Sequence, residues 1–277
     1  MILVTGATGN IGRDLLGELA TCGAGPVRGL TRDGARALFP EGVEVCEGDF
    51  ADPASLERAL DGVRSLFLVS RIGSDADILD AARRAGVEHV VLVSSITVQT
   101  HPHLGPAREN ATVEQLLKDD GMAWTVLRPT QFASNALWWA ESIRERRTVR
   151  VPYADTGLPT IHPADIAAVA RVVLTEPGHR GRTYALTGPE RVTARQQLEA
   201  IAAALGREVS LAGIGREEAH RQMSTVLGAE AADAVLDVTG GDVNEGLLEV
   251  RDTVERVTGA CARPFHRWVS ENIAAFR

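Results

Sequence analysis

The stretch ILVTGATGNIG, residues 2–12, decides the fold of this chain. Its apolar opening is typical of a buried strand, and the apolar spacing of 10–21 predicts a helix directly after it. Between them lie three glycines in T-G-x-x-G-x-x-G spacing: Gly6, Gly9 and Gly12. The first allows a tight turn, the second lets backbone N–H groups approach a ligand, and the third lets helix and strand pack closely. A strand, glycine turn and helix in this order predict a dinucleotide site, with the pyrophosphate at the helix N-terminus.

Short apolar runs alternate with helical patterns as far as residue 129. The strand-like runs are ILVTG (2–6), PVRGL (26–30), VEVCEG (43–48), SLFLV (65–69), HVVLVSS (89–95) and WTVLRP (124–129). The helical patterns between them cover 10–21, 33–38, 53–60, 75–85 and 109–120. This alternation predicts an α/β fold, a Rossmann-like, doubly wound and mainly parallel sheet. Nearly continuous apolar strands indicate that helices cover both faces.

Beyond about residue 130 the alternation gives way to other patterns. An amphipathic segment at 133–146 is followed by an extended stretch, helices at 163–175 and 193–205, and a mostly helical remainder. We expect an NADP-binding core over residues 1–150 and a smaller, mostly helical substrate lobe over residues 151–277. The boundary is soft, because no linker separates the two parts and they interleave.

Composition excludes several classes of function. The 277 residues carry 29 basic and 37 acidic side chains, a net charge of −8, without a basic run interleaved with aromatics, so nucleic acid is not expected as a partner. No apolar run reaches the roughly 20 residues that cross a bilayer, so we expect no membrane association and a cytoplasmic protein. The three cysteines are far apart and predict no metal site. The expected partner is a small-molecule substrate, and the sequence does not set the oligomeric state.

The end of the second strand indicates which dinucleotide binds. An NAD site usually places an acidic residue there, to accept from the ribose 2′-OH. Here Leu30 and Thr31 occupy that position. The positively charged guanidinium of Arg32, which follows them, can bind a 2′-phosphate instead. The alternative is a solvated arginine neutralised by Asp33. We therefore predict NADP(H) as the cofactor.

Asp49 and Phe50 follow the third strand, where an adenine ring needs an acceptor and an apolar wall. A turn that caps the next helix explains the same two residues equally well. Both interpretations stay open at this point.

Eight stretches together resemble the short-chain dehydrogenase/reductase superfamily, and within it the atypical NmrA-like branch with its polyketide ketoreductases and quinone reductases. They are TGATGNIG, VRGLTRD, EGDFADPASLERAL, LFLVS, HVVLVSS, VEQLLKDDGMAWTVLRPTQFASN, IHPADIAAVA and YALTGPE, and they span nearly the whole chain. The last three are the most informative, because they distinguish this branch from a generic Rossmann domain.

The resemblance implies a role for each part of the cofactor site. The pyrophosphate would be held by Gly6, Thr8, Gly9, Asn10 and Ile11. Arg32 would meet the 2′-phosphate, and the adenine would lie at Asp49 and Phe50. The ribose would lie along Val69 and Ser70, and the nicotinamide end near Ser94, Ser95 and Pro129. The C-terminal lobe would roof the substrate.

The chain departs from the superfamily at its catalytic pair, a serine followed by Tyr-x-x-x-Lys. Ser95 matches the serine. Counting back from Glu114, which resembles the glutamate after the lysine, the lysine position holds Asn110 and the tyrosine position holds Pro106. Proline cannot donate a proton, and asparagine has no charge with which to tune one. Ordinary tyrosine acid–base catalysis is therefore not expected.

Three functions remain open. The first is an NADPH-dependent oxidoreductase, a ketoreductase that reduces a carbonyl of a bulky aromatic ketone or quinone, a polyketide of antibiotic biosynthesis being one candidate. The proton would come from the substrate's own acidic hydroxyl or from the catalytic candidates Ser95 and His101. The second is a non-catalytic NADP(H) sensor that regulates a partner. The third, a nucleotide-sugar epimerase or dehydratase, is disfavoured because the tyrosine base is absent.

A substrate pocket is expected after the sixth strand. The candidate contacts there are Gln131, Phe132, Asn135, Trp138 and Trp139, with Thr97 and His103 from the loop after the fifth strand. A pair of tryptophans in a chain with few aromatic residues favours a flat, partly apolar ligand. The alternatives are helix packing for the tryptophans and solvent exposure for the two loop histidines.

Overall fold

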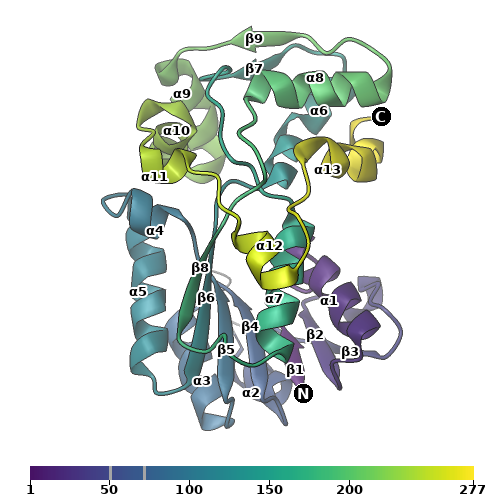
Figure 1. Cartoon of the computed structure of the whole chain (residues 1–277), viewed down its shortest axis with the longest axis vertical. Helices are drawn as coiled ribbons and strands as arrows, with labels where there is room; N and C mark the ends of the chain where they lie inside the picture. Colours follow the sequence, from purple (N-terminus) through teal and green to yellow (C-terminus); the bar gives the residue numbers. More distant parts are fainter. Residues whose placement is uncertain (50–51, 71–72) are drawn as a thin grey trace.

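Seven parallel strands form the central sheet of the computed structural model, which describes residues 1–49, 52–70 and 73–277 (Figure 1). In sheet order they are Val43–Glu47 (β3), Val27–Thr31 (β2), Ile2–Val4 (β1), Ser65–Val69 (β4), His89–Val93 (β5), Ala123–Pro129 (β6) and Arg182–Leu186 (β8). The order reverses between β1 and β4, so the carboxyl ends of these two strands flank the crevice where doubly wound sheets bind ligands. The predicted fold class is confirmed.

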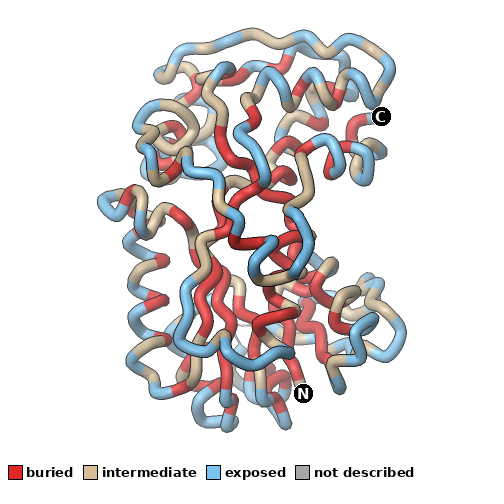
Figure 2. The backbone as a smooth tube through the Cα atoms, in the orientation of Figure 1, coloured by how far each residue is buried: buried red, intermediate tan, exposed pale blue. Residues whose placement is uncertain are grey.

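Each face of the sheet carries its own apolar core, as the buried strands in Figure 2 indicate. Alternate strand residues point to opposite faces. Val4 and Phe67 therefore pack with helices Asn10–Cys22 (α1) and Pro163–Thr175 (α7). Leu3 and Leu66 face the other way, toward Pro53–Leu60 (α2), Asp75–Arg84 (α3) and Gly105–Asp119 (α5). Because both faces are covered, the central strands are apolar at nearly every position.

Helix α1 follows directly from its sequence pattern. Leu15, Leu16 and Leu19 are fully buried on one side of the helix. Burying each such side chain contributes about 1.5–3 kcal/mol relative to exposure. The helix ends at Gly23, whose φ of 65° is the left-handed conformation that favours glycine. The first strand and this helix thus hold the turn between them in place.

The structure differs from the predicted elements at three segments. Only Gly34–Arg36 (η1) of the predicted helix 33–38 forms, a single 3-10 turn, because Leu38 is 91% exposed and gives the segment no apolar face to bury. Helix α5 begins at Gly105 rather than 109, since Pro106 is favourable in a first helical turn. The segment 133–146 divides into a 3-10 helix, Ala133–Trp139 (η2), and Ala140–Arg144 (α6).

The C-terminal residues build most of the upper part of the molecule in Figure 1. Its elements are Val149–Val151 (β7), Ala194–Leu205 (α8), Leu211–Gly213 (β9), Arg216–Leu227 (α9), Ala229–Leu236 (α10), Asp237–Gly241 (η3, a π turn), Glu245–Leu248 (α11), Thr253–Thr258 (α12), Phe265–Asn272 (α13) and Ile273–Phe276 (η4). A separate apolar cluster joins α6, β7, α8 and α13. Strand β8 and helix α7, however, belong to the central sheet and its cover, so residues after 150 contribute to both parts. Among the described helices, none is long and apolar enough to cross a membrane.

Candidate cofactor and substrate site

The glycine turn after β1 is shaped by contacts that a side chain would block. Gly6 has a φ of 59°, and its carbonyl oxygen accepts a hydrogen bond of 2.9 Å from the Gly9 N–H. A Cβ atom at Gly12 would lie 2.2 Å from that same oxygen, which is a steric overlap. A Cβ at Gly9 would lie 3.1 Å from it. The backbone is therefore as closely packed here as the glycine spacing predicts.

The N-terminus of α1 presents its backbone N–H groups to the crevice. Gly9 is the N-cap, and in the described part of the chain no side chain accepts from the first turn. Thr8, Gly9 and Asn10 are exposed, whereas the Ile11 side chain is buried in the core, leaving only its backbone to meet a ligand. Such a helix end, with the partial positive charge of the helix dipole, is suited to a pyrophosphate. The chain therefore has a cradle that fits a dinucleotide.

Arg32 lies exposed just beyond the end of β2. Asp33, which could have neutralised it, instead accepts from the Arg36 backbone N–H and pairs with the Arg36 guanidinium at 3.4 Å. Among residues 1–49, 52–70 and 73–277, no acidic side chain forms an ion pair with Arg32. Its guanidinium is thus available to a 2′-phosphate.

Asp49 and Asp52, which follow β3, both form hydrogen bonds near the start of α2. The backbone N–H of exposed Asp49 donates to the Ser55 hydroxyl at 2.9 Å, and Asp52 caps α2 by accepting from the Ala54 N–H at 3.1 Å. Asp52 therefore performs the capping that the sequence offered as an alternative for Asp49. Phe50, the other residue predicted at the adenine, lies outside the described residues.

Asn110 and Glu114 of α5 are joined to the strand ends by hydrogen bonds. The Asn110 amide donates to the Pro106 carbonyl oxygen at 2.9 Å, and its Oδ1 accepts from the Ser70 hydroxyl at 3.0 Å. Ser94, after β5, donates to the buried Glu114 carboxylate at 2.7 Å. The hydroxyls of Ser70 and Ser94 are therefore engaged in positioning β4 and β5 against α5.

Glu114 is the electrostatic centre of this arrangement. Its side chain is 2% exposed, and Arg128 donates to both carboxylate oxygens, at 2.8 and 2.6 Å, while Lys118 lies 3.3 Å away. Burial alone raises the pKa of such a carboxyl, but the hydrogen bonds from Arg128 and Ser94 outweigh it and lower the pKa of Glu114. Glu114 is thus a charged structural residue that ties α5 to β6.

Ser95 and Thr97 lie at the carboxyl end of β5, beside the end of β6. The Thr97 N–H and hydroxyl both donate to the Ser95 Oγ, at 3.2 and 2.8 Å. Ile96 between them donates its backbone N–H to the Pro129 carbonyl oxygen at 3.0 Å. Because the Ser95 oxygen accepts two hydrogen bonds, its own proton is directed elsewhere.

The two loop histidines differ in their surroundings. His101 is fully buried, its Nδ1 lies 2.8 Å from the Thr100 hydroxyl, and its Nε2 lies 2.5 Å from the Asp242 carbonyl oxygen. His103 is 61% exposed and lies 3.8 Å from the Asp242 carboxylate. Ser95, Thr97, His101 and His103 are not among the described residues that line the cavity described next.

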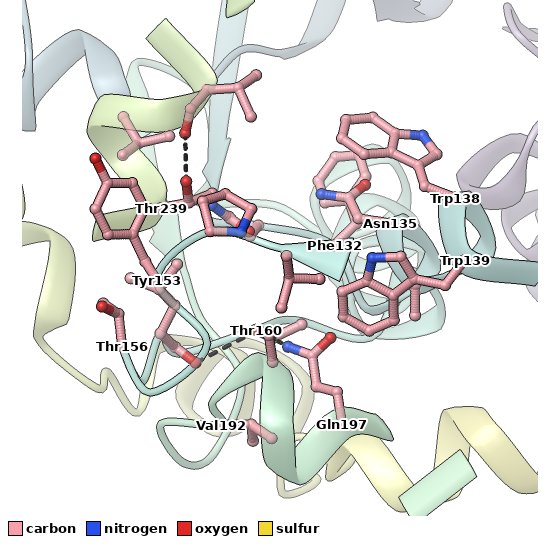
Figure 3. Close-up of a pocket in the computed structure, with 18 of the residues that line it drawn as sticks. Phe132, Asn135, Trp138, Trp139, Tyr153, Thr156, Thr160, Val192, Gln197 and Thr239 are labelled. Atoms are coloured by element: carbon pink, nitrogen blue, oxygen red, sulfur yellow. Dashed lines mark hydrogen bonds between the residues drawn. The ribbon is translucent and has the colours of Figure 1, made fainter. Parts of the chain in front are cut away.

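A cavity of about 250 Å³ opens where the chain leaves β6 and enters the C-terminal part. It is lined by Gln131, Phe132, Asn135, Trp138 and Trp139, five residues that the sequence predicted as substrate contacts. Figure 3 shows the tryptophans and Phe132 on one side of the space, with Tyr153 on the other. Trp138 is 60% exposed, so it lies at the rim. Such a cavity is suited to a flat and largely apolar ligand.

Several lining residues were not predicted from the sequence. Tyr153, Thr160, Gln197 and Thr239 come from three separate segments of the C-terminal part. Tyr153 has a left-handed φ of 50° and packs against Gly240, where a Cβ would lie 2.3 Å from the tyrosine ring. A glycine pair at 240–241 within a helical region was the one local signal of this close approach.

Comparison with known proteins agrees with this geometry. The profile of a family described as NAD(P)H-binding matches residues 6–177. The (4-alkanoyl-5-oxo-2,5-dihydrofuran-3-yl)methyl phosphate reductase of Streptomyces griseus is 40% identical over 282 residues, covering 100% of this chain and 99% of that protein. The NAD(P)H azoreductase of Xenophilus azovorans is 35% identical, with coverage of 100% and 99%.

A solved structure is similar over the same length. The NADPH-dependent quinone oxidoreductase of Escherichia coli, crystallised in complex with NADPH, superimposes with a TM-score of 0.81 at 28% identity, covering 99% of each chain. The predicted NADP(H) cofactor and the predicted oxidoreductase class are confirmed at this level. With its glycine cradle and a matching profile over more than half its length, the chain belongs to the NAD(P)H-binding family.

Proposed function

We propose that this NADPH-dependent reductase acts on a conjugated, electron-poor acceptor, a quinone or an aromatic ketone, bound in the cavity between Phe132, Trp139 and Tyr153. The observation that carries the proposal is the position of this aromatic-walled cavity, which opens directly beyond β6 at the carboxyl edge of the sheet. Aromatic polyketides belong to the same chemical class. In this proposal residues 1–150 hold the cofactor and residues 151–277 supply most of the roof.

The relatives support an acceptor of this kind. They are named for reduction of an azo compound, a quinone and an oxo-dihydrofuran phosphate. All three are conjugated groups that accept an electron pair readily. Such acceptors need less help from a strong protein acid than an isolated ketone does, which agrees with proline at position 106 and asparagine at position 110.

The chain's own residues would bind and orient the acceptor. NADPH supplies a hydride, and one proton completes the reduction. Gln131 and Asn135 line the cavity, and Figure 3 shows the Asn135 amide beside it. Such amides can donate to a carbonyl oxygen. The aromatic walls exclude water and fix the ring plane. Orientation and the exclusion of water are therefore the main contributions of the cavity.

Ser95 is the candidate for stabilising charge on the acceptor oxygen. Thr97 donates two hydrogen bonds to its Oγ, at 3.2 and 2.8 Å, which leaves the serine proton available to another acceptor. A donor that is already oriented costs no reorganisation when negative charge develops. We include Ser95 in the catalytic site, with the acceptor's own acidic hydroxyl as the second source of the proton.

Asn135→Ala tests this placement, with steady-state oxidation of NADPH in the presence of a naphthoquinone as the assay. Loss of an amide hydrogen bond to the acceptor should lower kcat/KM for the quinone about tenfold, while the Kd for NADPH stays unchanged. Asn272→Ala is the matched control, because its amide donates to the Trp268 carbonyl oxygen in α13. Equal turnover in wild type and Asn135→Ala would place the acceptor elsewhere.

A further inference from the structure

The charged side chain that lines the cavity is paired with a carboxylate. Arg150 is the one formally charged side chain among the described residues that line it. Its guanidinium lies 2.5 Å from the Glu218 carboxylate, on the first turns of α9. An arginine that is already paired offers a second anion little binding energy, because the new contact must replace the existing one.

A second arginine lies behind the cavity wall. Arg216 hydrogen-bonds to the Tyr153 side chain, and it pairs with Asp237 at 2.7 Å and Asp233 at 3.0 Å. These contacts raise the pKa of the Arg216 guanidinium, so its charge is fixed. Two arginines are thus paired with three carboxylates, and these five groups together carry a net charge of −1.

The polar groups inside the cavity are uncharged. Figure 3 shows the Gln197 amide beside the Thr160 hydroxyl, with Asn135 opposite. Amides and hydroxyls can satisfy carbonyl and hydroxyl groups on a ligand, but they do not neutralise a phosphate or sulfonate. Taking such an anion out of water without a partner is costly.

We infer that the cavity selects against anionic substrates, so that the natural acceptor is an uncharged aromatic or quinonoid compound. In this it would differ from the 40% identical Streptomyces griseus reductase, which is named for a phosphate substrate. This inference rests on the proposed function and adds its substrate class. The Arg150–Glu218 pair is the determinant of the selectivity. It keeps Arg150, which is 51% exposed and is the one cation among the described lining residues, from binding an anion.

The experiment compares three naphthoquinones that differ in one substituent: an uncharged methyl group, a sulfonate and a trimethylammonium group. Steady-state NADPH oxidation is measured at about pH 8, where histidine side chains are uncharged. Wild type should favour the methyl and trimethylammonium compounds over the sulfonate by about tenfold or more in kcat/KM.

Glu218→Gln then tests the determinant. Freeing Arg150 should raise kcat/KM for the sulfonate about three- to tenfold and leave the methyl compound unchanged. Because each substrate is compared with itself between variants, differences in intrinsic reactivity cancel. Glu217→Gln is the matched control, since it removes the same charge from an exposed neighbouring position on α9.

The outcomes separate the two proposals. Wild type that reduces the sulfonate as well as the methyl compound would overturn the selectivity while supporting the proposed function. An equal gain for the sulfonate in Glu218→Gln and Glu217→Gln would also overturn it, because the cause would then be overall charge. Absence of turnover with all three compounds would instead contradict the proposed function itself.

Discussion

The imidazole Nε2 of His101 lies 2.5 Å from the backbone carbonyl oxygen of Asp242. His101 is the C-cap of the short helix Thr97–Thr100 (α4). The contact joins the loop after β5 to the segment between η3 and α11. Asn244 adds a second link by donating to the Thr100 carbonyl oxygen at 2.8 Å. A third contact places the Glu230 side chain of α10 against Gly105, at the start of α5. The C-terminal helices are thus fastened to the core on the side where the cavity opens.

We predict that His101→Ala lowers the free energy of unfolding by about 2–4 kcal/mol, because it removes a fully buried side chain, opens a cavity and takes away the hydrogen bond to the Asp242 carbonyl oxygen. Urea denaturation followed by circular dichroism measures the change. His103→Ala is the control and should change stability by less than about 0.5 kcal/mol, since that side chain is 61% exposed. A His101→Ala protein of unchanged stability that has lost turnover would show that His101 acts in the chemistry instead.

Gly12→Ala should impair both stability and cofactor binding. The added Cβ would lie 2.2 Å from the Gly6 carbonyl oxygen, so the turn must shift, at a cost of about 1–3 kcal/mol. Gly17→Ala is matched to it on the same helix and has no atom within 4 Å of its added Cβ. That change should stabilise the protein by about 0.5–1 kcal/mol. Thermal unfolding and NADPH titration would refute the prediction if the two variants behaved alike.

Arg32→Gln should weaken the binding of NADPH about 10- to 100-fold and leave that of NADH unchanged, because only NADPH carries a 2′-phosphate. Fluorescence titration with each dinucleotide gives the two Kd values. Arg36→Gln serves as the control of equal charge, since that guanidinium already pairs with Asp33. The prediction fails if both variants weaken NADPH equally, which would indicate a general effect of charge.

Glu114→Gln should destabilise the protein by about 3–5 kcal/mol at pH 7, because it leaves the mostly buried Arg128 charge without its partner. The pKa of Glu114 is lowered in the folded protein, so its contribution is fully present above the ordinary value of 4.5 and is lost as the pH falls through the lowered value. The stability difference between wild type and variant should therefore shrink below about pH 4.5.

Urea unfolding at several pH values between about 3 and 7 measures this difference. Glu88→Gln is the surface control, because the Glu88–Arg64 pair is 48% and 73% exposed and contributes at most about 1 kcal/mol. A difference between wild type and Glu114→Gln that is constant over the whole pH range would exclude the proposed charge coupling.

The cofactor half of the site could be predicted from sequence because its determinants are local. Gly6, Gly9 and Gly12 lie within seven residues of one another, and Arg32 directly follows β2. Their spacing along the chain is therefore enough to predict their positions in the fold. The aromatic side of the cavity was predictable for the same reason, since Phe132 and Trp139 follow β6 closely in the chain. Local order in a βα unit is reliable because the strand and helix fix the turn between them.

The rest of the site depends on contacts between distant segments. Tyr153, Gln197 and Thr239 meet only because β7, α8 and the π turn at Asp237–Gly241 pack together, and no short-range pattern encodes that. His101 appeared as a loop residue next to the chemistry, whereas its partner Asp242 is 141 residues away. Tertiary packing decides whether a polar side chain such as His101 meets the substrate or a backbone carbonyl from a distant segment.

The most direct test of the account is NADPH oxidation with a small panel of uncharged quinones and aromatic ketones, run beside titrations of NADPH and NADH. We predict binding that favours NADPH and turnover of at least the quinones, with one NADPH consumed for each acceptor reduced. Tight binding of NADPH without turnover of any acceptor would contradict the account and would indicate a dinucleotide sensor instead.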